Sequence, residues 1–185
     1  MKCPSCRKPI TEPDARCPHC GLTLRKLDLR FGVAPKHFSY LTDRSLTLLP
    51  QNRAKLRTLL QLFRSKFPQS LFSVFVTELP LGTALSEYIF WLANRVQFSS
   101  VESTGENNFD LLLVIDLAAG EAGLAVGYGL ENYLSEEVLR DVLEAGRSAF
   151  EAKDWSAGIE RCVNRMMERM REISRAANKN DNVSF

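Results

Sequence analysis

Apolar and polar residues follow a helical period over much of this chain. Apolar positions repeat at i, i+3, i+4 and i+7 over residues 56–67, 85–96 and 156–175. Each repeat predicts a helix with one buried face. A fourth helix is expected after Ser135, whose hydroxyl can cap the first turn, and Thr83 can cap the second helix in the same way.

Three shorter apolar runs predict β-strands. These runs are Leu71–Leu79, Asp110–Asp116 and Leu124–Val126. The second is continuous and flanked by acids, which is typical of a central strand covered on both faces. Because only a short turn separates it from the third run, these two strands should form an antiparallel hairpin. Strands that alternate with helices predict a mixed sheet in an α/β/α sandwich.

The pattern before and after this region predicts the domain organisation. Apolar residues alternate with polar ones between residues 22 and 31, so part of this connector is expected to pair as a strand. We predict a small N-terminal module (1–24), a linker (25–40), an α/β domain (41–176) and a disordered polar tail (177–185).

Composition and charge narrow the class of protein. The 185 residues are 45% hydrophobic and 25% charged, as in soluble globular proteins. No apolar run approaches the ~20 residues of a membrane span, and no signal region precedes the first cysteines, so a cytoplasmic location is expected. Residues 1–38 hold eight Lys or Arg and three Asp or Glu, a net charge of +5, while the rest carries −3. This excess favours an acidic partner but is not a nucleic-acid signature.

Four cysteines in the first twenty residues carry the clearest chemistry. Cys3 and Cys6 form one C-x-x-C pair, and Cys17 and Cys20 form another. Two such pairs can place four thiolates around one tetrahedral ion, which predicts a structural Zn²⁺ site, with iron as the alternative by ligand type. A closed four-thiolate site leaves no position for a reacting water, so it is not catalytic. Disulfides are disfavoured in a reducing cytoplasm.

Three further stretches carry a family resemblance. Residues 41–56 (LTDRSLTLLPQNRAKL), 126–134 (VGYGLENYL) and 150–159 (FEAKDWSAGI) resemble motifs of the TPM domain family in order and spacing. The resemblance covers roughly residues 40–172, and the N-terminal segment resembles a zinc ribbon. It implies a Rossmann-like α/β/α sandwich with acidic loops. Some members of that family are weak acid phosphatases or bind divalent ions.

The resemblance also implies an acidic site that is incomplete here. Asp43 matches a family aspartate, but a second family aspartate appears as Asn107 and a third as Glu136. With Glu131, these residues are a candidate weak site for Ca²⁺ or Mg²⁺. Alternatively, Asp43 only caps a turn and Glu136 only stabilises a helix N-terminus. Tyr128 either lies at a groove with Glu131 or packs against the sheet.

Three functions are consistent with these features. The leading hypothesis is a non-enzymatic, cytoplasmic, zinc-binding adaptor with a degenerate TPM domain and a protein partner. A weak, divalent-metal-dependent acid phosphatase is the second. A zinc-ribbon protein that associates with nucleic acid is the third, and it would show salt-dependent binding.

Overall fold

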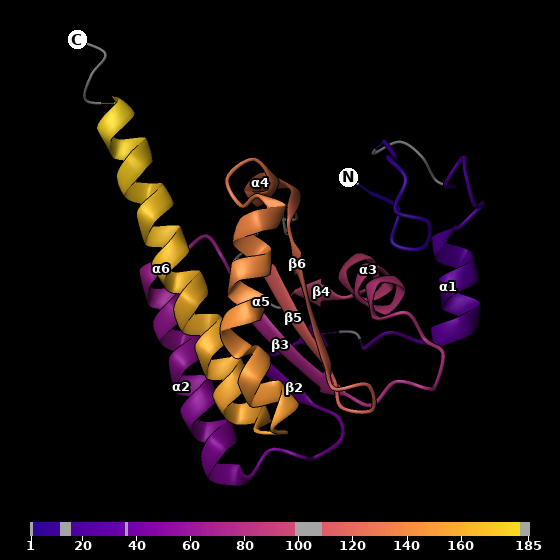
Figure 1. Cartoon of the computed structure of the whole chain (residues 1–185), viewed down its shortest axis with the longest axis horizontal. Helices are drawn as coiled ribbons and strands as arrows, with labels where there is room; N and C mark the ends of the chain where they lie inside the picture. Colours follow the sequence, from indigo (N-terminus) through magenta and orange to yellow (C-terminus); the bar gives the residue numbers. More distant parts are fainter. Residues whose placement is uncertain (1, 12–15, 36, 99–108, 182–185) are drawn as a thin grey trace.

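The computed structural model describes residues 2–11, 16–35, 37–98 and 109–181 (Figure 1). Helices and strands alternate along most of the chain, as the sequence predicts. The helices are α1 (Leu24–Phe31), α2 (Pro50–Lys66), α3 (Leu85–Arg95), α4 (Tyr128–Glu131), α5 (Glu136–Glu151) and α6 (Trp155–Asp181). The strands are β1 (His37–Phe38), β2 (Leu41–Asp43), β3 (Phe72–Thr77), β4 (Gln97–Phe98), β5 (Leu111–Asp116) and β6 (Glu121–Val126).

The main sheet has the strand order β2-β3-β5-β6. The first three strands are parallel, and β6 pairs antiparallel with β5, so the predicted hairpin and mixed sheet are confirmed. Val126 faces Leu111 in the register, and Glu121 faces Asp116. In the described part of the chain, β6 therefore forms one edge of this sheet. Two-residue strands β1 and β4 make a separate parallel pair.

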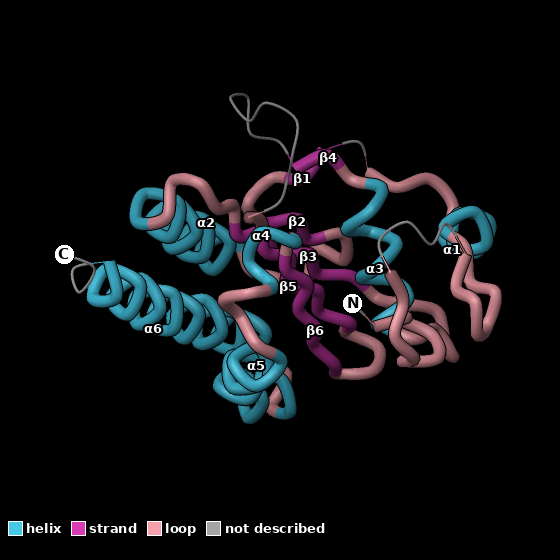
Figure 2. The backbone as a smooth tube through the Cα atoms, turned by 90° about the horizontal axis from the view of Figure 1, so that it is seen from above, coloured by secondary structure: helices cyan, strands magenta, loops and turns pink. Residues whose placement is uncertain are grey.

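Helices cover both faces of the sheet, which confirms the predicted sandwich (Figures 1 and 2). On one face, α2, α5 and α6 pack over an apolar cluster that includes Phe63, Phe72 and Ile159. On the other face, α3 packs over a second cluster with α1 outside it. Every residue of β3 and of β5 is buried, as expected of strands between two helical layers.

Small residues allow the helices to approach closely. A Cβ at Gly123 of β6 would collide with the Ile89 side chain of α3. A Cβ at Gly158 of α6 would collide with the Phe150 ring of α5. The packing of α3 on β6, and of α6 on α5, therefore depends on these two glycines.

The connector after the cysteines is helical, so the predicted strand there is wrong. The Thr23 side chain accepts a hydrogen bond from the Lys26 amide and starts α1. Leu27 is 2% exposed against α3, whereas Leu29 is 83% exposed. A helix that buries one side can show alternating apolar residues over so short a stretch, and a strand pattern cannot be told from it. Part of the expected linker is thus a packed helix.

Two other details differ from the prediction, and a third agrees with it. Helix α3 begins after Ala84, which makes no side-chain cap, so Thr83 is not the capping residue. Ser135 does cap α5, because its hydroxyl accepts from the Val138 amide. Helix α6 continues to Asp181, so much of the tail expected to be disordered is helical, and residues 182–185 lie outside the described residues.

Candidate functional site

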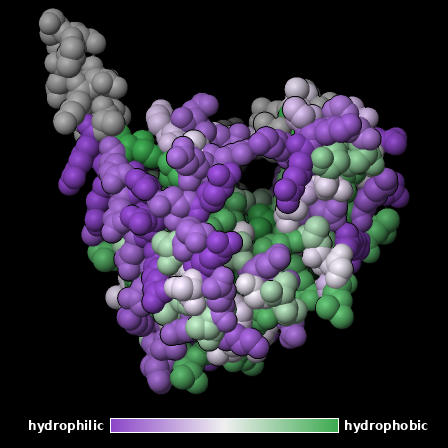
Figure 3. Space-filling view, viewed as in Figure 1, coloured by the Kyte–Doolittle hydropathy of each residue, from purple (hydrophilic) through white to green (hydrophobic). Residues whose placement is uncertain are grey.

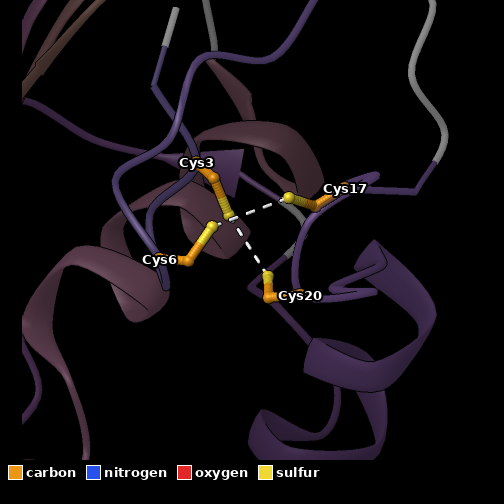
Figure 4. A group of neighbouring side chains, drawn as sticks. All are labelled: Cys3, Cys6, Cys17 and Cys20. Atoms are coloured by element: carbon orange, nitrogen blue, oxygen red, sulfur yellow. Dashed lines mark hydrogen bonds between the residues drawn. The ribbon is translucent and has the colours of Figure 1, made fainter.

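The four N-terminal cysteines converge on one point (Figure 4). Their Sγ atoms all lie within 4.8 Å of one another. The Cys3 and Cys20 sulfurs are 3.7 Å apart, and those of Cys6 and Cys17 are 3.8 Å apart. Each close contact joins one C-x-x-C pair to the other, so both turns contribute to a single cluster.

These separations fit a metal ion bound by four thiolates. Four ligands at ~2.3 Å from a tetrahedral ion lie ~3.8 Å from one another, which matches the observed spacing and is far longer than an S–S bond of ~2.05 Å. Within the described residues, no other group of three or more His, Cys, Asp or Glu side chains places its ligand atoms this close together. The donor set can hold zinc, and such an ion would supply structural cross-linking.

The two turns share one backbone geometry. The Arg7 amide donates to the Cys3 carbonyl, and the Gly21 amide donates to the Cys17 carbonyl, each at 2.9 Å. Arg7 has a φ of 59°, and Gly21 has a φ of 69°, so both second cysteines are followed by a left-handed residue. Glycine adopts this conformation freely, whereas arginine adopts it at a cost of about 1 kcal/mol. The hydrogen-bonded turn therefore holds Arg7 in a left-handed conformation that arginine does not favour by itself.

Burial and backbone dipoles act on the thiols in opposite directions. Burial raises the pKa of Cys3 to about 11, although the amides of Cys6 and Ser5 oppose it. The pKa of Cys17 is lowered to about 6, chiefly because the Cys20 amide points at its sulfur. Amides that face sulfur stabilise thiolates, as a metal-binding turn requires.

Two polar contacts help to fasten the cysteine module (residues 2–11 and 16–22) to the α/β domain. The Lys2 ammonium lies 2.5 Å from the Glu136 carboxylate at the start of α5. On the other side, the Ser86 hydroxyl of α3 donates to the Pro4 carbonyl at 2.8 Å. The module therefore spans from α3 to α5 across the edge of the sheet.

A groove of about 650 Å³ lies below this bridge, along the outer edge of β6. We call it the β6 groove. Figure 3 shows it as a hollow with apolar residues between the two lobes, with hydrophilic side chains joining the lobes above. Helix α3 forms one wall, α5 forms the other, and Lys2 and Pro4 line the upper end. Its apolar lining includes Leu85, Ile89, Phe90, Leu124, Leu139 and Leu143.

Only three of the twenty residues that line the groove are charged. They are Lys2, Asp110 and Glu131, and all lie toward the end of the groove where β6 finishes. The Asp110 carboxylate accepts the Leu71 amide at 2.8 Å, and burial raises its pKa. Asp110 was not among the predicted site residues, although its position just before a buried apolar run marks the start of a strand.

Tyr128 and Glu131 of the VGYGLE motif both line the β6 groove. Tyr128 opens α4 and is 44% exposed, and Glu131 ends that helix and is also exposed. The motif thus turns the chain from β6 into α4 and places both side chains beside the groove. A binding role for Tyr128 stays a prediction.

Asp43 lies at the other end of the sheet from these residues. It is the last residue of β2 and is in register with Val76, near the end of β3. Its carboxylate accepts the Leu48 amide at 2.9 Å and the Thr47 amide at 3.3 Å, so it closes the turn that follows. Asp116, also at this end, is buried and accepts the amides of Leu79 and Ala118.

Glu131 and Glu136 follow β6, whose end is in register with the start of β5. The structure therefore does not bring Asp43 together with these two glutamates (Figure 1). Asn107 lies outside the described residues. Lys2 lowers the pKa of Glu136 through their hydrogen bond. Binding of Ca²⁺ or Mg²⁺ by any of the four residues stays a prediction.

Comparison with solved structures identifies related folds. The N-terminal domain of a protein from P. gingivalis has a TM-score of 0.53 and 22% identity, and the match covers 71% of this chain and 81% of that one. The BA42 protein from Bizionia argentinensis has a TM-score of 0.54 and 8% identity, covering 71% and 86%. The N-terminal domain of the cg2496 protein from Corynebacterium glutamicum has a TM-score of 0.53 and 13% identity, covering 70% and 78%. These identities establish a shared fold alone.

Comparison with protein families and with curated proteins gives two results. No curated protein matches the chain. Residues 41–169 match the TPM domain, and this segment contains the whole main sheet, α2 to α5 and much of α6. Since it spans more than half of the sequence, the protein belongs to the TPM domain family.

Proposed function

We propose that this protein is a zinc-stabilised, non-enzymatic adaptor that holds a partner protein in the β6 groove. The supporting observation is that two separate parts of the chain build this groove, with apolar walls and few charges. The cysteine module supplies one end, and the TPM domain supplies the walls. A volume of about 650 Å³ lies within the roughly 300–1,000 Å³ of small-molecule pockets, so the groove takes a short segment of a partner protein.

The polar groups of the groove favour binding over catalysis. A general acid–base pair needs titratable groups that converge on one reacting position. Lys2 is paired with Glu136, and Asp110 accepts a backbone amide. The Ser86 hydroxyl donates to the Pro4 carbonyl. These groups already stabilise the fold.

None of the described helices combines the length and the apolar content that a membrane crossing requires. The apolar lining of the β6 groove supports a protein partner, and we expect the contacting segment of that partner to be apolar.

Selection from a library of displayed random peptides tests the proposal, with the zinc-loaded full chain as bait. We expect enriched apolar sequences that bind the wild type and lose binding to Leu139→Glu, which places a charge in the α5 wall. Leu29→Glu is the matched control, because Leu29 is 83% exposed and lies on α1 outside the groove. Failure to enrich any sequence, or equal binding by both variants, would contradict the proposal.

Enzyme activity is measured on the same preparation. We expect no hydrolysis of p-nitrophenyl phosphate above the buffer rate, with or without Mg²⁺ or Ca²⁺. Turnover that Asp43→Ala or Glu131→Gln abolishes would replace the adaptor with the phosphatase alternative. Salt-dependent binding of single-stranded DNA would instead favour the nucleic-acid alternative.

A further inference from the structure

The outer edge of β6 leaves backbone groups that face the groove. The Gly127 amide donates to the Asp110 carbonyl, so this pair is a hydrogen-bonded one in the antiparallel ladder. Along an antiparallel ladder, such pairs alternate with pairs whose N–H and C=O groups point away from the partner strand. In the described part of the chain, no other strand lies on that side of β6. The N–H and C=O groups of Ala122, Leu124 and Val126 therefore point toward the groove.

Given the proposed binding function, we infer that the β6 groove takes an extended peptide that adds to the sheet as a fifth strand. Backbone donors and acceptors at every second residue match those of another β-strand, and strand addition to a sheet edge is a common mode of peptide recognition. The apolar walls on α3 and α5 then contact the peptide side chains on the two faces of the extended sheet.

The charges at the upper end define the peptide's polarity. Lys2 is paired with Glu136, whereas Glu131 is exposed and makes no ion pair within the described residues. With Asp110 beside it, this end of the groove carries an excess of carboxylates. A lysine or arginine of the peptide complements it. In an antiparallel peptide, that cation precedes the apolar residues, because the end of β6 meets the start of the new strand.

The shape of the groove selects an extended segment over a second folded copy. The edge of β6 lies between the walls of α3 and α5, and the cysteine module closes over one end. A second copy that paired through β6 would bring its own α3 and α5 to the same edge, beside the walls already there. A single strand, with neighbours ~4.8 Å away in the pairing direction, fits between them.

Fluorescence anisotropy with the labelled peptide Lys-Val-Thr-Val-Thr-Val tests this inference on the zinc-loaded full chain. Two further peptides carry backbone N-methyl groups at alternate residues. One peptide is methylated at the odd-numbered residues, and the other is methylated at the even-numbered residues, which gives the two phases. We expect one methylated peptide to lose binding at least ~10-fold and the other to bind like the parent, because only alternate N–H groups face β6. Equal effects in both phases would overturn strand addition.

The charge match has its own control. Glu131→Gln should weaken binding of the lysine peptide about 2–5-fold, as expected for an exposed ion pair. Glu137→Gln, on the exposed start of α5 outside the groove, should leave binding unchanged. Equal behaviour of the two variants would contradict the assigned polarity.

Two outcomes separate this inference from the proposed function. Library peptides that bind in the groove but tolerate N-methylation in both phases would overturn strand addition and leave the adaptor function standing. Dimerisation of the free protein in sedimentation, abolished by Leu124→Pro but not by Leu29→Glu, would assign the edge to a second copy. That result would overturn the peptide inference.

Discussion

The cysteine module and the α/β domain hold their structure by different means. Residues of the module surround four sulfurs, and among them only Cys3, Cys17 and Gly21 are buried. The domain instead packs two apolar clusters on the two faces of one sheet. A segment of this length cannot bury enough apolar surface to fold alone, so we expect cross-linking by an ion to replace a core. The β6 groove lies where these two kinds of structure meet.

Metal removal should give the largest effect, because it should unfold the whole cysteine module while the α/β domain stays folded. Chelation, or Cys6→Ser, should remove the ordered amide signals of the cysteine module and leave those of the described part of the α/β domain in place. His19→Ala, which lies between the ligands Cys17 and Cys20 but is not itself a ligand, should retain one metal per chain. The measurement is an ¹⁵N–¹H spectrum together with metal analysis, which also separates zinc from iron. An unchanged module spectrum without metal would contradict the account.

The boundary between the two regions can be tested at α1. Leu27→Ala should reduce the free energy of unfolding of the domain by about 2–5 kcal/mol, because it deletes a side chain that is 2% exposed against α3. Leu29→Ala, at an 83% exposed position of the same helix, should change it by less than ~0.5 kcal/mol. Equal effects in urea unfolding would mean that α1 belongs to a linker, as first predicted from the sequence.

A substitution in the core of the α/β domain should lower the stability of the domain without affecting metal binding by the cysteine module. Gly158→Ala adds a Cβ that collides with the Phe150 ring between α5 and α6, at an expected cost of about 1–3 kcal/mol. Thermal unfolding should shift downward while the metal content stays at one per chain. Glu144→Ala, exposed on α5, is the control and should shift it little. Metal loss in Gly158→Ala would show that the regions are coupled.

Asp110 should give the smallest effect, and one that depends on pH. Burial raises the pKa of its carboxyl above the ordinary value of 3.8, so the protonated form favours folding, and this contribution is lost as pH rises through the raised pKa. Asp110→Asn keeps an oxygen for the Leu71 amide but cannot ionise. Its stability relative to wild type should therefore increase with pH over that range. A difference that stays flat or falls would contradict this assignment.

The sequence predicts features that depend on local spacing. Cysteine spacing predicts the four-sulfur cluster, and the short turn before Leu124 predicts the β5–β6 hairpin. The short strand β2 was missed, because three residues carry too little periodicity to be recognised. Helix α1 was mistaken for a strand because its burial depends on α3, far along the chain.

The β6 groove could not be predicted either, because it too depends on contacts between segments far apart in the sequence. It needs α3, β6, α5 and the cysteine module to meet, and no single segment carries that information. The VGYGLE motif gave a groove that holds Tyr128 and Glu131 as only one of two interpretations, and the family resemblance associated Glu131 with Asp43. The parallel order of β2, β3 and β5 places Asp43 at the opposite end of the sheet.

The cysteine module and the α/β domain together build one groove, which we propose binds a peptide. The most direct test is a titration of the zinc-loaded, ¹⁵N-labelled full chain with the lysine peptide, followed by amide shifts. We expect saturable shifts in both regions, at Lys2 and Cys3 of the module and at Ala122, Leu124 and Leu143 of the domain. Shifts confined to one region, or none at a millimolar peptide concentration, would contradict the account.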